Sequence, residues 1–292
     1  MVPKSNPTNK NKMEVEFSLL QDISQLESFL KEELKLSKSS LKKYGLNRKL
    51  LNKSFKKREA IRLPLDLLNQ GIVNPLYKGP AIKIIHQDEQ LIVLEKPHQI
   101  HCHPLRYNES DNILSFLRQS GHGKHLTQTE AEKGLLNRLD FETSGVLVFV
   151  KDPVLHRELR DNFENLIKQK TYHAIVKGDF DKEGEHKHFL GQKGEKGKLV
   201  IAQEDGAGKE ATIIVEKLKY HSGADKSLLQ VSLIGGHRHQ IRVQLQQLGY
   251  PIFGDLQYGG EPAERLFLHA YSYTITIDER EHLFKSEQNF DV

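Results

Sequence analysis

Residues 137–150 read NRLDFETSGVLVFV. The last five residues are all apolar, and a short apolar run bounded by turn residues predicts a buried strand. Arg138 and Asp140 stand two residues apart in the polar part before it. A rigid strand positions the loop that precedes it, and such loops often carry chemistry. The pair therefore indicates a functional loop, unless Asp140 only caps a turn and pairs with Arg138 at the surface.

Three further stretches bear on this choice. They are IIHQDEQLIVLEKP (84–97) with a His-Pro pair at 103–104, KTYHAIVKG (170–178), and HQIRVQL (239–245) with Gly254-Asp255 and Tyr258 behind it. Together with 137–145, and in this order, they resemble the sequence signatures of RluA-type pseudouridine synthases. The resemblance covers about residues 80–275 and favours a functional loop at Asp140.

The chain departs from the family pattern at three places. Asn137 stands where the family usually has His, Gln99 where a Gly follows the Lys-Pro turn, and His237-Arg238 where it has Arg-Thr. These departures leave Asp140 and Arg242 in place. They therefore bear on subfamily and target rather than on the reaction.

The resemblance implies an α+β fold over 80–285, the pseudouridine synthase fold: a mixed, largely antiparallel sheet with flanking helices and a central cleft. It also implies isomerisation of uridine to pseudouridine in structured RNA; the basic αL-like segment described below favours ribosomal RNA over transfer RNA, which stays open. The base detaches, turns and rejoins its sugar through carbon, so no atom leaves and no cofactor is expected. A monomer is the expectation for the family.

The resemblance also assigns roles in the reaction. Asp140 would be the catalytic carboxylate, acting as nucleophile or as acceptor of a sugar proton. Arg242 would hold that carboxylate, since a guanidinium suits a bidentate grip. Tyr172 would pack against the base and could act as a general base; otherwise it is a core aromatic.

Two more residues are expected to contact RNA. Arg138 would fill the space left by the extruded base or hold a phosphate, because a stacking guanidinium can stabilise opened RNA. Leu268 would line the base pocket.

The N-terminal part is strongly basic. Between residues 35 and 62 there are eleven Lys or Arg and one acid, Glu59. Such a cluster gives sequence-independent affinity for nucleic acid, although a solvated basic face is the usual alternative. Residues 17–75, with two short helices expected within 22–43, resemble an αL RNA-binding domain, a small α/β module. Its expected RNA contacts are Lys38, Lys42, Lys43 and Arg48.

Flanking segments complete the organisation. Residues 1–16 are polar and are expected to form a disordered tail without a secretory signal, and 71–80 a linker. Of the later segments, 82–86 and 91–94 suggest a hairpin, 209–212 and 228–234 strands, and 181–198 an exposed loop. A helix is expected after Asp152-Pro153, with one face reaching Ile167, and another from Gln240.

Composition narrows the class of protein. No apolar run approaches the roughly 20 residues that span a membrane, and Cys102 is the single cysteine. One cysteine allows no intramolecular disulfide and fits a reducing compartment, so a cytoplasmic protein is expected.

Two other groups of residues suggest chemistry at first sight. His101-Cys102-His103 lacks a second cluster with ligand spacing, so no metal is expected. Residues 191–198 lack the ending of a phosphate loop. An alternative function is a non-catalytic RNA-binding or ribosome-assembly protein on this fold. A metal-dependent hydrolase would need ligand spacing that these histidines do not show.

Overall fold

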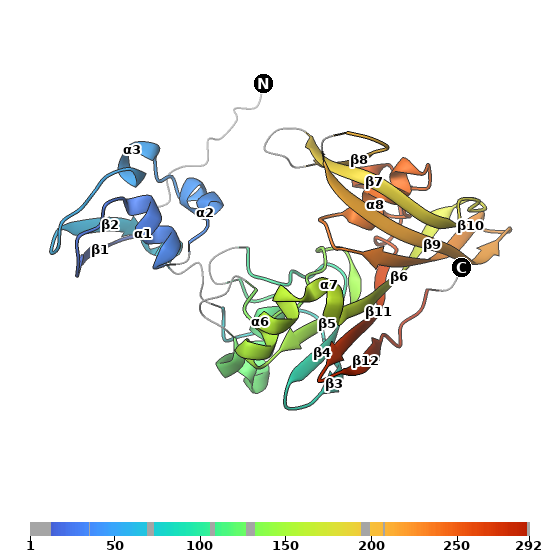
Figure 1. Cartoon of the computed structure of the whole chain (residues 1–292), viewed down its shortest axis with the longest axis horizontal. Coiled ribbons are helices and arrows are strands. Elements are labelled where there is room, and N and C mark those ends of the chain that lie inside the picture. The colour runs from blue at the N-terminus through green and yellow to red at the C-terminus, as the bar shows by residue number, and fades with distance from the viewer. Residues whose placement is uncertain are drawn as a thin grey trace, which may run out of the picture. The chain divides into compact units, whose positions relative to one another are not determined.

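The computed structural model describes residues 13–34, 36–68, 73–105, 109–126, 132–193, 199–206 and 208–290. The chain forms two compact units (Figure 1). The first holds the described residues up to Asn74, together with Pro104, Leu105 and Glu109. The second holds Pro75–His103, 110–126 and the described residues from Glu132 onward. Residues 1–12 of the expected tail, Lys35 of the basic cluster, and 71–72 of the expected linker lie outside the described residues.

The first unit is a small two-stranded sheet with short helices. Strand β1 (Glu14–Ser18) pairs antiparallel with β2 (Ala60–Pro64), and the helices are α1 (Leu26–Glu32), α2 (Lys38–Lys43), α3 (Arg48–Leu51) and α4 (Leu65–Leu68). Apolar residues spaced along these elements, among them Leu26, Leu30 and Leu41, form one core. The two helices expected within 22–43 are present. The disordered tail expected over 1–16 is wrong for residues 14–16, which belong to β1 and pair with β2.

The second unit is built on a ten-stranded sheet. Its strands are β3 (Lys83–Gln87), β4 (Leu91–Lys96), β5 (Ser144–Val150), β6 (Ile167–Lys177), β7 (Gly184–Lys193), β8 (Leu199–Gln203), β9 (Lys209–His221), β10 (Lys226–Ile234), β11 (Leu268–Ile277) and β12 (Arg280–Lys285). The order is β3-β4-β5-β11-β6-β10-β9-β7-β8, and β12 pairs with β11. Within the described residues β11 runs parallel to β5, and the other strand pairs are antiparallel. The predicted mixed, largely antiparallel sheet is confirmed.

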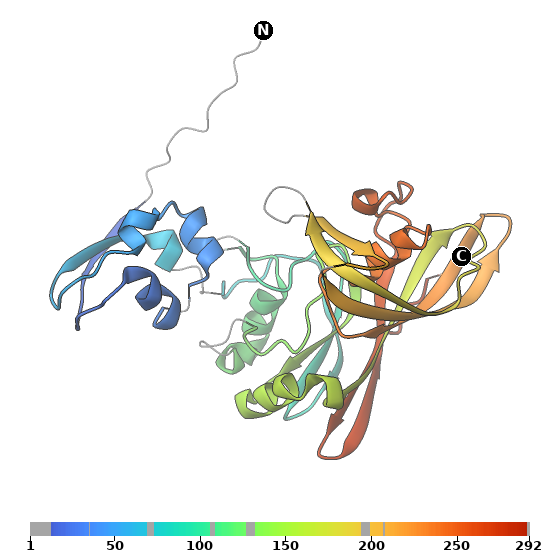
Figure 2. The ribbon, with the colours of Figure 1, turned by 45° about the horizontal axis from the view of Figure 1, so that its top comes forward.

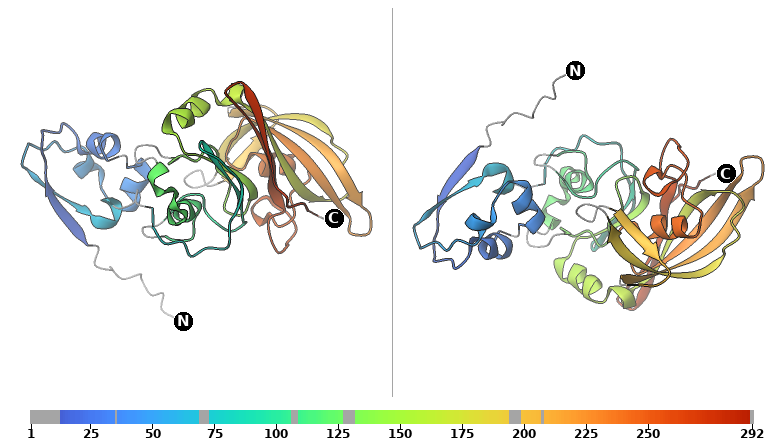
Figure 3. Two further views of the ribbon diagram at one scale, coloured as in Figure 1. Left: turned by 90° about the horizontal axis from the view of Figure 1, so that it is seen from below. Right: turned by 90° about the horizontal axis from the view of Figure 1, so that it is seen from above.

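Helices flank the two halves of this sheet. Helices α6 (Pro153–Asp161) and α7 (Phe163–Leu166) lie beside the half that contains β4 and β5, where Leu155, Leu159 and Phe163 join the core of that half (Figure 2). Helix α8 (Gln240–Gln247) packs on β7, β8 and β9, which curve around it (Figure 3). Its Val243 shares a core with Leu190 and Val200. Shorter helical elements are α5 (Ile113–Leu117), η1 (Arg118–His122), η2 (Gly123–His125) and η4 (Leu256–Tyr258).

Most element predictions are confirmed, and two are wrong. The apolar run 146–150 lies in β5, the hairpin is β3–β4, and the strands near 209 and 228 are β9 and β10. Of the segment 181–198, expected to be an exposed loop, residues 184–193 form strand β7, whose His188 and Leu190 are buried while Phe189 between them is more exposed. Residues 194–198 lie outside the described residues. The helix expected to reach Ile167 ends at Asp161, since Asn162 leaves helical geometry (φ −109°, ψ 30°), and Ile167 begins β6.

Gly145 explains how the functional loop enters the sheet. Its φ is +116°, and a Cβ there would lie 2.2 Å from the carbonyl oxygen of Ala270 in β11. Only glycine permits both that dihedral and that approach. The loop that carries Asp140 is therefore anchored where β5 meets β11. Among the described residues, no helix combines the length and apolar character needed to cross a bilayer.

Candidate active site

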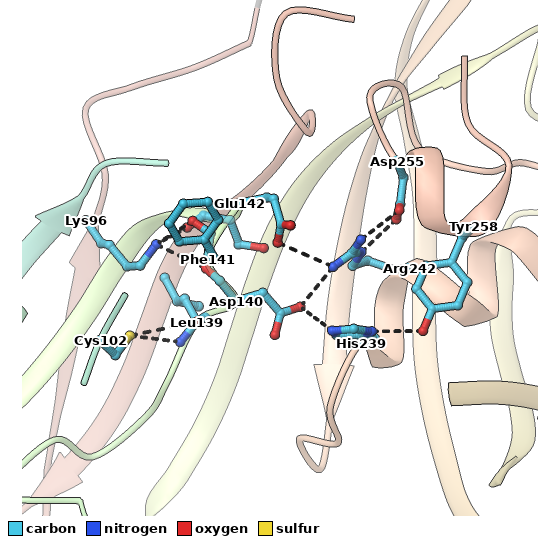
Figure 4. A network of polar contacts seen from close by, with 11 residues as sticks. Lys96, Cys102, Leu139, Asp140, Phe141, Glu142, His239, Arg242, Asp255 and Tyr258 are labelled. Carbon is cyan, nitrogen blue, oxygen red and sulfur yellow. Dashed lines mark hydrogen bonds and ion pairs between the residues drawn. The ribbon is translucent and has the colours of Figure 1, made fainter. Parts of the chain in front are cut away.

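The loop before β5 is held from inside the protein. Lys96, at the end of β4, is fully buried, and its ammonium donates to the carbonyl oxygens of Asp140 (3.1 Å), Phe141 (3.3 Å) and Thr143 (2.7 Å). The backbone N–H of Leu139 lies 3.5 Å from the Cys102 sulfur. Burial lowers the pKa of Lys96 to about 8. These contacts fix the loop backbone while the Asp140 side chain points away from Lys96 (Figure 4).

The local turn does not use the Asp140 side chain. Its carbonyl oxygen accepts the Thr143 N–H at 3.2 Å and closes the turn. Arg138 is exposed, and within the described part of the chain no ion pair joins it to Asp140. The alternative of a turn cap with a surface ion pair is therefore wrong, and the carboxylate is available for another role.

Arg242 faces this carboxylate from α8. Its Nη1 lies 3.6 Å from Asp140 Oδ2 and 3.7 Å from Glu142 Oε2. Its bidentate partner is Asp255 and not Asp140 as expected: Nε–Oδ2 and Nη2–Oδ1 are both 2.7 Å. Burial disfavours the cation, but the hydrogen bonds and charge of Asp255 outweigh it and raise the pKa of Arg242. Asp255 thus orients Arg242 so that its third nitrogen, Nη1, faces the carboxylates of Asp140 and Glu142.

His239 approaches the same oxygen of Asp140. Its Nε2 lies 3.8 Å from Oδ2, and its Nδ1 is 2.8 Å from the Tyr258 hydroxyl (Figure 4). The Asp140 side chain is 29% exposed. Among the described residues, Oδ1 has no hydrogen-bond or ion-pair partner. One carboxylate oxygen therefore faces two cationic or hydrogen-bonding groups, and the other is unengaged among the described residues.

A buried amide fixes the start of α8. The Gln240 side chain accepts the His237 N–H (3.0 Å) and donates to the carbonyl oxygens of Thr212 (3.1 Å) and Ile234 (3.2 Å). These bonds tie the segment before α8 to β9 and β10. His239 and Arg242 are thereby presented from a fixed helix end.

Tyr172 and Leu268 occupy one face of the sheet. Tyr172 in β6 pairs with Ala270 of β11, and Leu268 stands two residues before Ala270, so side-chain alternation puts Tyr172 and Leu268 on the same side. Both are buried. Burial, and then the charge of Asp140, raise the pKa of Tyr172. The phenol therefore keeps its proton at neutral pH, which favours a packing role over that of a general base.

The predicted site residues fall into two groups. Asp140, Arg138, Tyr172, Arg242 and Leu268 belong to the second unit. The basic residues of the first unit lie on α2 and α3 and are exposed: Lys38, Lys42, Lys43 and Arg48. Of these, Lys43 donates to the carbonyl oxygen of Leu105 at 2.9 Å.

Sequence reasoning gave no role to several residues of this network. Lys96, Glu142 and Asp255 stand inside the matched stretches, as do His239 and Tyr258. That position was the available signal, because a charged or polar residue between motif positions is a candidate partner for them. In the part of the chain that the structure describes, no group of three His, Cys, Asp or Glu could hold a metal. The Cys102 sulfur is engaged with Leu139, and His103 Nε2 contacts the Glu132 carbonyl at 3.2 Å.

Comparison with known proteins shows which family this chain belongs to. The model for RNA pseudouridylate synthase matches residues 90–247. A Borreliella burgdorferi protein named ribosomal large subunit pseudouridine synthase D is 32% identical over 211 residues, which cover 70% of this chain and 63% of that protein. A Vibrio cholerae protein named ribosomal large subunit pseudouridine synthase C is 31% identical over 206 residues, covering 64% of this chain and 59% of that protein. The matches therefore span less than two thirds of either relative.

Solved structures agree in fold. The human RNA pseudouridylate synthase domain containing 1 superposes with a TM-score of 0.59 at 21% identity, over 73% of this chain and 86% of that one. The human domain containing 4 gives 0.54 at 22% identity, over 70% and 88%. These superpositions indicate a fold shared with both.

Proposed function

Because this chain belongs to the RNA pseudouridylate synthase family, we propose that it is an isomerase that converts uridine to pseudouridine in RNA, with Asp140 as its catalytic carboxylate. The observation that carries the proposal is the Asp140 side chain. Oδ2 faces Arg242 and His239, while Oδ1 is unengaged among the described residues and the side chain remains partly open. Such a carboxylate can approach a sugar carbon or its proton.

The remaining residues would serve this reaction in distinct ways. The glycosidic bond breaks, the base turns, and C5 bonds to the sugar; the proton lost from C5 is balanced by one gained at N1. Arg242 would stabilise the Asp140 carboxylate whenever it is released. Tyr172 would form a wall against the turning base, with Leu268 beside it on the same sheet face.

Extrusion of the uridine is the other requirement. Unstacking a base costs a few kcal/mol, so a group must occupy or stabilise the opened RNA. Arg138 is exposed and unpaired with Asp140 two residues from the catalytic position. It would stack in the vacated space or hold an adjacent phosphate.

We propose ribosomal RNA as the target class, acted on by a monomer in the cytoplasm. The names of the Borreliella and Vibrio relatives support a ribosomal substrate, and transfer RNA is the other candidate. The first unit would be an αL-like RNA-binding domain. Its support is the exposed Lys38, Lys42 and Arg48, which have no ion-pair partner within the described residues.

The test is tritium release from RNA labelled at C5 of uridine, prepared from a host that lacks the modification. The parent should release tritium with and without EDTA. Asp140→Asn, which keeps the shape and removes the charge, should lower the rate by at least about a thousandfold, as expected for loss of an essential group. Asp161→Asn, the same change at an exposed position on α6, is the matched control and should act like the parent.

Other outcomes would separate the alternatives. No release by the parent, with tight RNA binding that Asp140→Asn preserves, would favour a non-catalytic RNA-binding protein. Release that EDTA abolishes would contradict a metal-free isomerase. Mapping the modified uridine in ribosomal and transfer RNA would decide the target class.

A further inference from the structure

Arg242 alone holds Asp140 weakly. Its two 2.7 Å hydrogen bonds go to Asp255, whose side chain is fully buried. The third nitrogen, Nη1, is shared between Asp140 and Glu142 at 3.6 and 3.7 Å. One guanidinium therefore faces three carboxylates. A second donor at Asp140 would fix the orientation that Arg242 leaves loose.

His239 is in place to be that donor. It is the residue before α8 and adopts a left-handed backbone conformation, φ 56° and ψ 20°. A residue with a Cβ adopts this conformation at a cost of about 1 kcal/mol or more, so the surrounding structure must hold it there. The side chain is 9% exposed, and it lies between Asp140 Oδ2 and the Tyr258 hydroxyl.

Tyr258 sets which ring nitrogen of His239 carries the proton. Burial raises the pKa of Tyr258, so it is a phenol with one proton to donate, and the backbone N–H of Val200 interacts with its oxygen. With that N–H directed at the oxygen, the phenol proton is free to point at His239 Nδ1, 2.8 Å away. Burial lowers the pKa of His239. The charge of Asp140 acts in the opposite direction, and the charges of Arg242 and Arg238 lower the pKa further. The neutral ring then accepts at Nδ1 and carries its hydrogen on Nε2, towards Asp140.

We propose that Tyr258 and His239 are positioning residues for the isomerisation: the Tyr258 hydroxyl fixes the ring and tautomer of His239, whose Nε2–H holds Oδ2 of Asp140 so that Oδ1 faces the substrate. This inference rests on the function proposed above. The 3.8 Å separation of Nε2 and Oδ2 is a long contact, and catalytic hydrogen bonds often tighten only when substrate binds. The pair orients the carboxylate and takes no proton from the substrate.

The first test is Tyr258→Phe in the full-length protein, assayed by tritium release. This change keeps the ring, which packs with Leu190 and Val243, and removes only the hydroxyl. We expect kcat to fall by up to about tenfold, the upper end of the range for one neutral hydrogen bond, with KM for RNA unchanged. Tyr250→Phe is the matched control, because it also loses a hydrogen-bonded hydroxyl, one that contacts Asp181, and it should keep the parent's kcat.

The second test compares two substitutions of His239. His239→Ala should lower kcat more than Tyr258→Phe does, whereas His239→Gln, whose amide offers an N–H near the position of Nε2, should recover part of the loss. Both replace histidine in the same left-handed backbone, so similar melting temperatures would show that recovery comes from the donor. A purely structural role would move the melting temperature and leave no difference in kcat between Gln and Ala.

The outcomes separate this inference from the proposed function. An active parent whose kcat survives both Tyr258→Phe and His239→Ala would overturn the inference and leave the isomerase intact. A rise in KM at unchanged kcat would also overturn it, since that would indicate contact with RNA. A parent without activity would remove the proposed function, and the inference with it.

Discussion

At the scale of single residues, Lys170 is a buried charge without an acidic partner among the described residues. It is 6% exposed in β6, and its ammonium lies 4.9 Å from the centre of the Phe163 ring. Burial lowers the pKa of Lys170 to about 8, from 10.5 for an exposed lysine. The folded protein thus binds this proton less tightly than the unfolded chain does.

The stability of the protein should therefore depend on pH through Lys170. Between about pH 8 and 10.5 the unfolded chain holds the proton and the folded protein releases it. Lys170 should therefore make the free energy of unfolding rise with pH, by at most about 1.4 kcal/mol per pH unit. Below pH 8 both states are protonated and the destabilisation is complete. Lys170→Met should remove this dependence, so the variant's advantage over the parent should shrink between pH 8 and 10.5 in urea denaturation.

The control for this prediction is Lys168→Met. Lys168 lies on the same strand and is exposed, so its variant reports the loss of one charge as such. An advantage of Lys170→Met that stayed constant over this pH range would contradict the proposed cause. Lys170→Met being less stable than the parent at pH 7.5 would also contradict it, since the charged side chain would then stabilise the folded protein.

The same scale shows what could be predicted for the site. The proximity of Asp140 and Arg242 was expected from the resemblance, and the two residues do lie together. The prediction that Arg242 binds Asp140 through two hydrogen bonds was wrong. A guanidinium near several carboxylates binds the most buried and best aligned one, which here is Asp255. That choice depends on three-dimensional burial and not on motif spacing. The Tyr258–His239 contact could not be foreseen for the same reason, since it needs the fold of residues 239–258.

At the scale of elements, the strands with apolar runs were predictable and β7 was not. β5 is buried along its whole length, so its sequence carries a strong signal. In β7 the buried positions are His188 and Leu190, and the exposed face carries Lys and Glu. This strand packs on α8 and buries only one histidine and one leucine, so its amino-acid composition is close to that of a loop. Pairing with β8 and β9 decides its structure.

Gly145 gives the prediction at this scale. Gly145→Ala would place a Cβ 2.2 Å from the Ala270 carbonyl oxygen at φ +116°, so β5 and β11 would have to separate. We expect a loss of stability of at least about 3 kcal/mol, as for other backbone-strained or overpacked sites. We also expect a loss of activity, because the Asp140 loop leads directly into β5 and would shift with it. Thermal melts followed by circular dichroism would measure it.

Gly191→Ala is the matched control for Gly145→Ala. Its Cβ would meet only the Ile201 side chain at 3.7 Å, an ordinary contact, and Gly191 has no left-handed φ. We expect its melting temperature to stay near that of the parent. Equal effects of the two substitutions would mean that the loss of a strand glycine, and not the approach of β11, causes the change.

At the scale of the whole molecule, the division into units follows the sequence only in part. The boundary between Asn74 and Pro75 lies inside the segment 71–80, which proline and glycine mark as a linker. Pro104, Leu105 and Glu109, however, belong to the first unit although the chain around them belongs to the second. Contacts between distant segments decide this, and no local pattern records them.

The exposed cations of the first unit should contribute to RNA binding. Lys38, Lys42 and Arg48 are exposed and have no ion-pair partner within the described residues. If they meet RNA phosphates, changing all three to Gln should weaken RNA binding and flatten its dependence on salt, by about 0.7 to 0.9 per contact in the slope of log K against log salt. The turnover rate at saturating RNA should stay the same, because the residues proposed for catalysis belong to the second unit. Titrations at several salt concentrations, with tritium release alongside, would measure both.

The first unit itself offers the control for this experiment. Lys53, Lys56 and Arg62 carry the same number of charges but are paired with Glu59 (3.5 Å), Asp22 (2.9 Å) and Glu16 (2.6 Å). A paired cation displaces fewer counterions from RNA than a free one, so the Gln variant of these three should reduce the salt slope less. Equal reductions would indicate a general effect of net charge, and no reduction in either variant would place RNA binding outside the first unit.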